Sequence, residues 1–340
     1  MKNNWKRTLS LLLALMMLAA LMAACGAQNT PAPASEVADE EEVDLPEGEG
    51  IEADIGPLLD EAVPLADGPL LSTMLTVSAP GTLVKENASA VIDYSNTKDG
   101  YVMIKWLGER DAKIKALLKG PSGTTYQYNL RTDGQYDAFP FSDGNGTYKV
   151  GVYKNTSGTK YSTALSVDVT VAMSDEFAPF IRPNQYVNYN TDSAVVKKAA
   201  EICAGATENL QKVDKVYTWV INKITYDYDK AATVQSGYVP NVDEILSSRK
   251  GICFDYAALM SAMLRSQGVP VKLVVGYTGD VYHAWISVYS EKEGWVEGKI
   301  YFNGKEWKLM DPTFASGGKG SSEVQNYIGN GANYTSKYLY

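Results

Sequence analysis

The sequence predicts an all-β sandwich over residues 70–175, followed over residues 176–340 by a region that combines helices with strands. In the first region, short alternating apolar runs are broken by turn residues, a pattern typical of strands joined by tight turns. In the second region, apolar residues first recur at the three- and four-residue spacing of amphipathic helices. Towards its end, runs of β-branched and aromatic residues predict strands again.

The first region contains regularly spaced strand candidates separated by turns rich in glycine, proline and asparagine. The clearest candidates are Tyr101–Trp106, Lys113–Leu118, Thr147–Tyr153 and Leu165–Val171. Short strands at this spacing over about 100 residues predict an immunoglobulin-like sandwich. The region holds no histidine and no cysteine, so we expect it to present or position a substrate rather than to carry out chemistry.

The second region begins with two predicted amphipathic helices. Thr191 or Asp192 can cap the first helix. Cys203 lies on the apolar stripe of that helix, and we interpret it as a core residue. Thr207 can cap the second helix, and residues 241–248 are a candidate for a third, short helix.

A further apolar stripe, at residues 256, 259, 260, 263 and 264, predicts a helix that is buried on one face and begins near Cys253. We expect Gly251 to mark the turn before this helix and Gly268-Val269-Pro270 to end it. At a helix start, unpaired N–H groups and the positive end of the helix dipole favour a thiolate over a thiol. Cys253 is therefore either a small core residue or a nucleophile.

The chain has one histidine, His283, which lies 30 residues after Cys253. Residues 281–289 around it are rich in β-branched and aromatic residues and predict a strand. Asp311 follows 28 residues later, and Pro312 biases its backbone to an extended conformation. A lone strand histidine is more often structural, but together the three residues supply a nucleophile, a base and a carboxylate that orients the base.

Three sequence blocks in this order carry a family resemblance: Gly251-Ile252-Cys253, His283-Ala284-Trp285 and Asp311-Pro312-Thr313. They resemble the signature blocks of the transglutaminase-like superfamily, and the resemblance runs from about Gln185 to the C-terminus. It implies an α+β catalytic domain, similar in its core to papain-like cysteine proteases, with the nucleophile helix packed on an antiparallel sheet. It also implies thiol chemistry on an amide, with Cys253, His283 and Asp311 as the catalytic triad.

The resemblance further implies an oxyanion site beside the nucleophile. The backbone N–H of Cys253 is one natural donor to it. Papain-like enzymes add a side-chain donor from upstream, and Tyr226 is our candidate for that donor. Trp285 either forms a wall of the site or belongs to the core. A disulfide between Cys203 and Cys253 is an alternative in an exported protein, and it would silence the nucleophile.

Residues 1–24 predict a signal peptide. Lys2, Lys6 and Arg7 precede an apolar run over residues 9–24, which is short for a membrane span. The run ends at Leu21-Met22-Ala23-Ala24-Cys25, which resembles the lipobox of bacterial lipoproteins, with Met22 where leucine is commoner. We therefore expect a lipid on Cys25 and a location on the extracytoplasmic face of the cell membrane. An ordinary secretory signal cleaved nearby is the alternative.

Residues 25–69 predict an acidic, disordered linker. From Gly26 to Asp67 there are 13 acidic residues and no lysine or arginine, with proline, alanine and glycine throughout. Such a composition cannot bury enough apolar surface to offset chain entropy. The net charge of −9 is therefore a property of the linker, and binding of cations or a basic wall component is the alternative role for it.

These features predict an exported thiol enzyme that acts on amide bonds of peptide or protein substrates. Hydrolysis is favoured slightly over cross-linking, because many members of the superfamily are hydrolases and the sequence shows no calcium-loop spacing. The alternative is a non-catalytic surface module that binds peptides or cell-wall components. The sequence predicts no cofactor, no metal site and no nucleic-acid partner, since it shows neither a ligand cluster, a phosphate loop nor a basic patch. It leaves the oligomeric state open.

Overall fold

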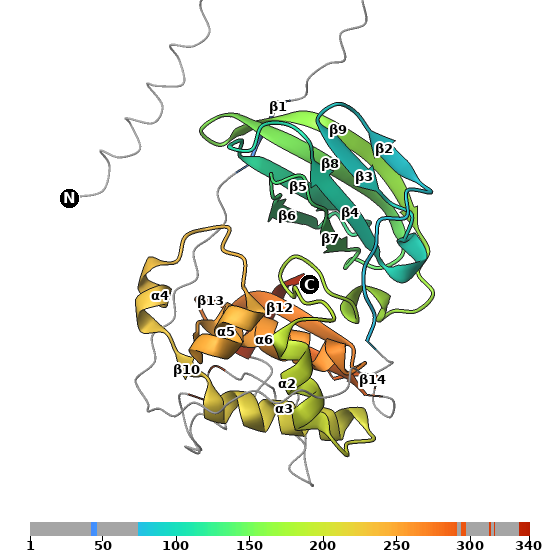
Figure 1. Ribbon diagram of the computed structural model, residues 1–340. Coiled ribbons are helices and arrows are strands. Elements are labelled where there is room, and N and C mark those ends of the chain that lie inside the picture. The colour runs from blue at the N-terminus through green and yellow to red at the C-terminus, as the bar shows by residue number, and fades with distance from the viewer. Residues whose placement is uncertain (1–41, 46–73, 291–293, 297–312, 314–315, 317–332) are drawn as a thin grey trace, which may run out of the picture. The chain divides into compact units, whose positions relative to one another are not determined.

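The computed structural model describes residues 42–45, 74–290, 294–296, 313, 316 and 333–340 (Figure 1). The predicted signal peptide, Cys25 and Asp311 lie outside the described residues, so their predictions stay predictions. The limits of the predicted domains also stay predictions. Within the described residues, the last strand of the sandwich ends at Val171 and the first α-helix begins at Ala194.

The N-terminal region is a sandwich of two antiparallel sheets. One sheet has the strand order β2-β3-β4-β7, and the other has the order β1-β9-β8-β5-β6. The inward-facing side chains are apolar or aromatic, as the alternating burial of β6 shows. The strands are β1 (Glu42–Asp44), β2 (Val84–Glu86), β3 (Ala90–Asp93), β4 (Tyr101–Trp106), β5 (Ile114–Lys119), β6 (Thr125–Asn129), β7 (Asp137–Pro140), β8 (Gly146–Ser157) and β9 (Lys160–Val171). The four clearest strand predictions are confirmed, with shifts at their ends.

Strand β1 lies inside the segment that the sequence predicts to be a disordered linker. It pairs antiparallel with β9, and the N–H of Leu45 donates to the carbonyl of Thr159 at 2.8 Å. Val43 and Leu45 pack against a small apolar cluster of Leu117, Tyr153 and Tyr161. Two apolar side chains in alternation are enough to attach a short strand to a sheet edge, although the segment around them is acidic.

The C-terminal region contains five α-helices and six strands among its described residues. The helices are α2 (Ala194–Cys203), α3 (Asn209–Lys223), α4 (Tyr228–Thr233), α5 (Val242–Ser248) and α6 (Cys253–Ser266). The strands are β10 (Thr225–Tyr226), β11 (Lys250–Gly251), β12 (Val271–Thr278), β13 (Val281–Ser290), β14 (Gly294–Val296) and β15 (Tyr334–Leu339). Strands β12 to β15 form an antiparallel sheet in the order β14-β13-β12-β15, while β10 and β11 pair in parallel.

The helix starts differ in detail from their predictions. Helix α2 begins after Ser193, not after Thr191 or Asp192, and α3 begins after Glu208, not after Thr207. The short helix predicted over residues 241–248 is confirmed as α5, where the Asn241 side chain accepts a hydrogen bond from the N–H of Glu244 at 3.2 Å. Helix α4 has no counterpart among the predicted helices, because it is only six residues long.

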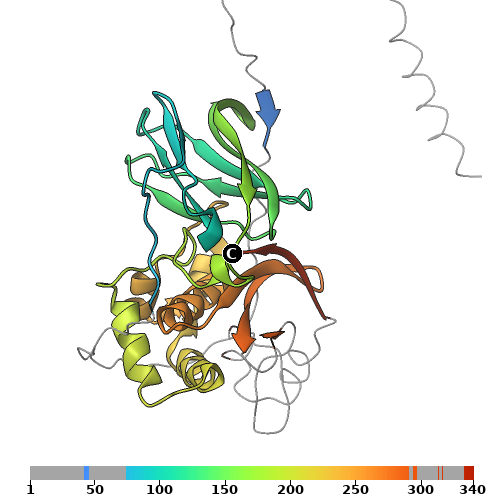
Figure 2. The same ribbon diagram turned by 90° about the vertical axis from the view of Figure 1, so that its right-hand side faces the viewer.

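Helix α6 is buried on all sides, which corrects the prediction of a single buried face. Every residue from Cys253 to Ser266 is buried. Helices α2, α3 and α5 pack on one side of it, and strands β12 and β13 pack on the other (Figures 1 and 2). The second face, which lies opposite the predicted apolar stripe, carries small residues, namely Ala257, Ala258, Ser261 and Ala262. Small side chains let neighbouring elements approach closely, so this face is buried without being strongly apolar.

Candidate active site

Cys253 is the first residue of α6, and its side chain is fully buried. The preceding residue, Ile252, has an extended backbone with φ −90° and ψ 177°. The sequence prediction of a cysteine at a helix start is therefore confirmed. At this position the backbone N–H of Cys253 belongs to the first turn, whose N–H groups have no partner within the helix. Sulfur and N–H can thus act on the same carbonyl group.

His283 lies on β13, which confirms the predicted strand, and its register partner on β12 is Gly276. Arg265, near the end of α6, donates from Nε to the carbonyl oxygen of Val271 at 3.0 Å, so β12 starts beside the last turn of α6. Strands β12 and β13 both pack against α6, so His283 lies on the sheet beside the helix that begins with Cys253.

His283 is buried beside an aromatic side chain. Its side chain is 1% exposed. Its ring stacks on the ring of Trp285, two residues along the same face of β13. The ring centroids are 6.2 Å apart, and the interplanar angle is 20°. Trp285 is also buried, and its ring packs against that of Tyr334 of β15 with the centroids 5.1 Å apart. Trp285 therefore belongs to the core and flanks the imidazole as well.

Asp311 lies outside the described residues, but the chain just after it contacts α6. Ser316 donates from Oγ to the hydroxyl of Tyr256 at 3.0 Å, and the same Oγ lies 3.1 Å from the carbonyl oxygen of Thr313. Tyr256 is the fourth residue of α6, and it donates to the carbonyl of Ile224 at 2.8 Å. Residues 313 and 316 are therefore attached to the first turn of the helix that begins with Cys253.

Tyr226 lies on β10, directly beside the segment that leads into α6. It pairs with Gly251 in the parallel β10–β11 ladder. Burial raises the pKa of Tyr226 well above its usual range, and a negative charge on Cys253 raises it further. The phenol is protonated at neutral pH, so Tyr226 can donate a hydrogen bond from the strand beside the segment that leads into α6.

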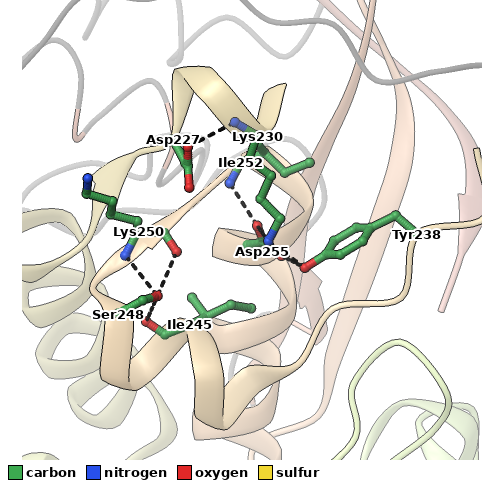
Figure 3. Close-up of polar contacts among 8 residues, drawn as sticks. All are labelled: Asp227, Lys230, Tyr238, Ile245, Ser248, Lys250, Ile252 and Asp255. Carbon is green, nitrogen blue, oxygen red and sulfur yellow. Dashed lines mark hydrogen bonds and ion pairs between the residues drawn. The ribbon is translucent and has the colours of Figure 1, made fainter. Parts of the chain in front are cut away.

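Sequence reasoning missed a buried carboxylate, Asp255, on the third residue of α6. Its Oδ2 accepts from the N–H of Ile252 at 2.9 Å and from Lys230 Nζ at 2.7 Å, and its Oδ1 accepts from the Tyr238 hydroxyl at 2.7 Å (Figure 3). The signal was present, because an acidic residue three positions after a helix cap commonly accepts from the N–H of the cap residue. The two partners from residues 228–240 carry no such signal.

Gly251 has a role other than the predicted turn. It is a strand residue of β11, and a Cβ added to it would lie 2.6 Å from the Cβ of Asp255. Real Cβ atoms do not approach so closely, so only glycine leaves room for the buried carboxylate. The glycine of the signature block thus serves close packing beside the first turn of α6.

The two described cysteines are free thiols, so the structure contains no disulfide between Cys203 and Cys253. Cys203 is the last residue of α2 and is buried, as expected for a core residue. Burial raises the pKa of the Cys203 thiol from 9.0 to about 11. Cys203 therefore stays a thiol at neutral pH.

Among the described residues, no group of three or more histidine, cysteine, aspartate or glutamate side chains is arranged to hold a metal ion. None of the described helices is both long enough and apolar enough to cross a membrane.

Comparison with known proteins identifies the family of this region. Residues 196–312 match the family model of the transglutaminase-like superfamily, so the C-terminal region belongs to that superfamily. The chain is 28% identical over 137 residues to kyphoscoliosis peptidase of Mus musculus, covering 37% of this chain and 19% of the mouse protein. It is 29% identical over 68 residues to a protein-glutamine gamma-glutamyltransferase of Pseudomonas aeruginosa, covering 16% of this chain and 10% of that protein.

Among solved structures, a candidate cysteine protease from Cytophaga hutchinsonii is similar, with a TM-score of 0.37 and 17% identity. The match covers 67% of this chain and 76% of that protein. The chain thus spans less than a fifth of the length of the mouse peptidase and most of the length of the bacterial structure.

Proposed function

We propose that this protein is an exported, lipid-anchored thiol enzyme that performs acyl transfer or hydrolysis at amide bonds of peptides or proteins. Cys253 is the nucleophile, His283 the base, and Asp311 the carboxylate that orients the imidazole. One observation carries the proposal: the first residue of the buried helix α6 is a cysteine, and the chain's one histidine lies on β13, a strand that packs against this helix. The superfamily match supports the same chemistry.

The reaction starts with attack of the Cys253 sulfur on the amide carbonyl carbon, while the thiol proton passes to His283. The carbonyl electrons move onto oxygen, and this oxyanion accepts hydrogen bonds from the N–H of Cys253 and from the Tyr226 hydroxyl. Cleavage of the C–N bond follows, with the proton passing from His283 to the leaving amine. Water or a second amine then attacks the thioester, loses a proton to His283, and restores the free thiol.

We propose water as the main acceptor, which makes the enzyme a peptidase or amidase rather than a cross-linking transglutaminase. The longer alignment with the mouse peptidase than with the glutamyltransferase supports this choice. The test uses one glutamine-containing peptide in the presence and absence of a primary amine. Release of ammonia or of a peptide fragment without amine incorporation is the expected result, and preferential amine incorporation would reverse the assignment.

The nucleophile assignment is tested with a thiol electrophile, iodoacetamide, followed by peptide mapping of the full-length protein. Cys253 should be labelled at neutral pH, and Cys253→Ala should abolish both labelling at this position and substrate turnover. Cys203→Ala is the matched control and should keep both. A protein that binds peptides but shows no labelling at Cys253 would be better described as a non-catalytic surface module.

The orienting role of Asp311 is tested separately. His283→Ala should be nearly as severe as loss of the thiol, because the chain holds no second imidazole. Asp311→Asn should reduce turnover by about 10²–10⁴-fold. The double variant should be no worse than His283→Ala alone, since residues that act as a unit are non-additive. Independent, multiplying losses would mean that Asp311 does not serve His283.

Export and the lipid anchor rest on the sequence of the first 25 residues. Metabolic labelling with a fatty acid should mark the wild-type protein and leave Cys25→Ala unlabelled. Under this proposal the immunoglobulin-like sandwich presents or positions the substrate at the extracytoplasmic face. A protein recovered without lipid would instead point to an ordinary secretory signal.

A further inference from the structure

Asp255 is a buried carboxyl group that the proposed triad does not use. Its side chain is fully buried, yet every hydrogen bond that it accepts comes from a different segment or from the helix start. Lys230 is the charged partner, and its own side chain is 28% exposed. A buried ion pair contributes little net stability, because the desolvation of both charges offsets their attraction. We therefore look for the role of the Asp255–Lys230 pair in the positions of the segments that it joins, rather than in stability.

The Asp255–Lys230 pair closes a ring of contacts between two segments. One segment is β10 and α4, and the other is β11 and the start of α6. The N–H of Asp227 donates to the carbonyl of Gly251 at 3.0 Å, and the Asp227 side chain accepts from the N–H of Lys230 at 3.0 Å. Lys230 Nζ then reaches Asp255, whose Oδ2 also accepts from Ile252 (Figure 3).

The two segments in this ring carry the two groups that act on the carbonyl oxygen in the proposed mechanism. Tyr226 immediately precedes Asp227, and Cys253 immediately follows Ile252. The β10–β11 ladder is only two residues long on each strand, too short to fix their relative position by itself. The side-chain ring supplies the missing constraint, and Tyr238 reinforces it from the loop after α4, donating to Asp255 and contacting Lys230 Nζ at 2.6 Å.

We propose that Asp255 and Lys230 are positioning residues that hold the Tyr226 hydroxyl beside the oxyanion formed at Cys253. This inference rests on the proposed function. It assigns neither residue a contact with the substrate. Loss of the pair should let β10 shift relative to the start of α6, and a displacement of about 1 Å at a reacting group can cost up to about 10²-fold in rate.

Two probes of Cys253 separate positioning of Tyr226 from damage to the nucleophile. Iodoacetamide alkylates sulfur by direct displacement: an S–C bond forms, the C–I bond breaks, and iodide leaves without an oxyanion. p-Nitrophenyl acetate acylates sulfur through a tetrahedral oxyanion: an S–C bond forms, p-nitrophenolate leaves, and an acetyl thioester remains for water to hydrolyse. Only the second probe needs the Tyr226 hydroxyl.

The experiment measures both rates on the full-length protein, with alkylation at Cys253 followed by peptide mass spectrometry and acylation by release of p-nitrophenolate. Tyr226→Phe should slow acylation by about 10²-fold and leave alkylation nearly unchanged. Lys230→Met and Asp255→Asn should each slow acylation by roughly 10-fold or more, again with little effect on alkylation. Lys230→Arg should retain most of the wild-type acylation rate, because arginine keeps a cation at the same place.

A matched control comes from the opposite end of α6. Lys212 is another half-buried lysine, and its Nζ donates to the carbonyl of Gln267 at 2.8 Å. Lys212→Met should leave both rates unchanged. In the Tyr226→Phe background, Lys230→Met should have no further effect on acylation, because the group that it positions is already absent.

The outcomes distinguish this inference from the proposed function. Equal slowing of both probes in Lys230→Met would show a structural effect on the nucleophile itself and would overturn the positioning role. Additive losses in the Tyr226→Phe background would overturn it as well. Absence of any reaction at Cys253 in the wild-type protein would instead overturn the proposed function. If Asp255→Asn fails to fold, Lys230→Met still decides, because that side chain is partly exposed.

Discussion

The two ends of helix α6 each bury a charged side chain, and they satisfy it in different ways. At the first turn, Asp255 has a charged partner, a hydroxyl and one backbone N–H. At the last turn, Arg265 makes four hydrogen bonds to backbone carbonyls, those of Arg182, Val271 and Tyr340. Within the described part of the chain Arg265 has no hydrogen bond to an aspartate or glutamate side chain, and burial lowers its pKa from 12.5 to about 10.

The difference indicates which role each end of α6 has. Both charges have the sign that the helix dipole favours, with the anion at the N-terminus and the cation at the C-terminus. The carboxylate binds side chains from the segment that follows Tyr226, so it can set the geometry of the proposed site. The guanidinium binds only backbone groups from a linker, a strand start and the last described residue, so it fixes the course of the chain.

The largest expected effect is therefore on stability and lies at the Arg265 end. Arg265→Met keeps the length of the side chain but removes four charge-assisted hydrogen bonds, each about 1.5–3 kcal/mol. Relief of the desolvation cost, several kcal/mol, offsets part of this loss. We expect a net decrease of about 3 kcal/mol in the free energy of unfolding, measured by denaturant titration of the full-length protein.

Arg265→Lys is the conservative partner to that experiment. It retains the positive charge but not the planar fork that reaches three separate carbonyl groups. Its stability should fall between those of the wild type and Arg265→Met. If Arg265→Met is as stable as the wild type, the carbonyl contacts contribute nothing net, and the contrast between the two helix ends is lost.

An intermediate effect is expected at the Asp255 end from Gly251→Ala. The added Cβ would lie 2.6 Å from the Cβ of Asp255, so β11 or the helix start has to move. Overpacking of this kind costs about 1–3 kcal/mol. Because the same movement displaces the start of α6, acylation of Cys253 by p-nitrophenyl acetate should slow more than the stability loss alone explains. A variant that loses stability but keeps its acylation rate would show that the packing of Gly251 is purely structural.

The sequence predicted the elements with strong local signals. Such signals are present in the strands of the sandwich and in helices α2, α3 and α5. They are also present in the strand with His283 and at the helix start with Cys253. Each rests on periodicity, a cap or β-branched runs within a window of about ten residues. The superfamily membership was also predicted, because it depends on three short blocks whose order and spacing can be recognised in the chain.

The features that the sequence did not predict depend on contacts between distant residues. Lys230 and Asp255 lie 25 positions apart, and nothing in either local pattern indicates that they meet. The second face of α6 consists of small residues whose burial becomes apparent only when the surrounding helices and strands are in place. Strand β1 likewise needs the edge of β9 before its two apolar side chains become a docking surface.

The smallest expected effect compares two helix ends that both carry a cysteine. Cys203 is the last residue of α2, at the negative end of that helix dipole, whereas Cys253 is the first residue of α6, at the positive end. With a pKa of about 11, Cys203 holds roughly one thiolate in a thousand molecules at pH 8. Its alkylation by iodoacetamide should therefore be slow at pH 8 and rise about tenfold per pH unit until pH approaches 11.

Peptide mapping at a series of pH values measures both cysteines in one sample. We expect labelling at Cys253 to exceed labelling at Cys203 by at least about 10²-fold at pH 8, and Cys203→Ala to leave the Cys253 rate unchanged. A flat pH profile at Cys203 would mean that access through local opening, rather than ionisation, controls its reaction. Equal rates at both positions would show that the start of α6 gives its cysteine no advantage, and the nucleophile assignment would lose its physical basis.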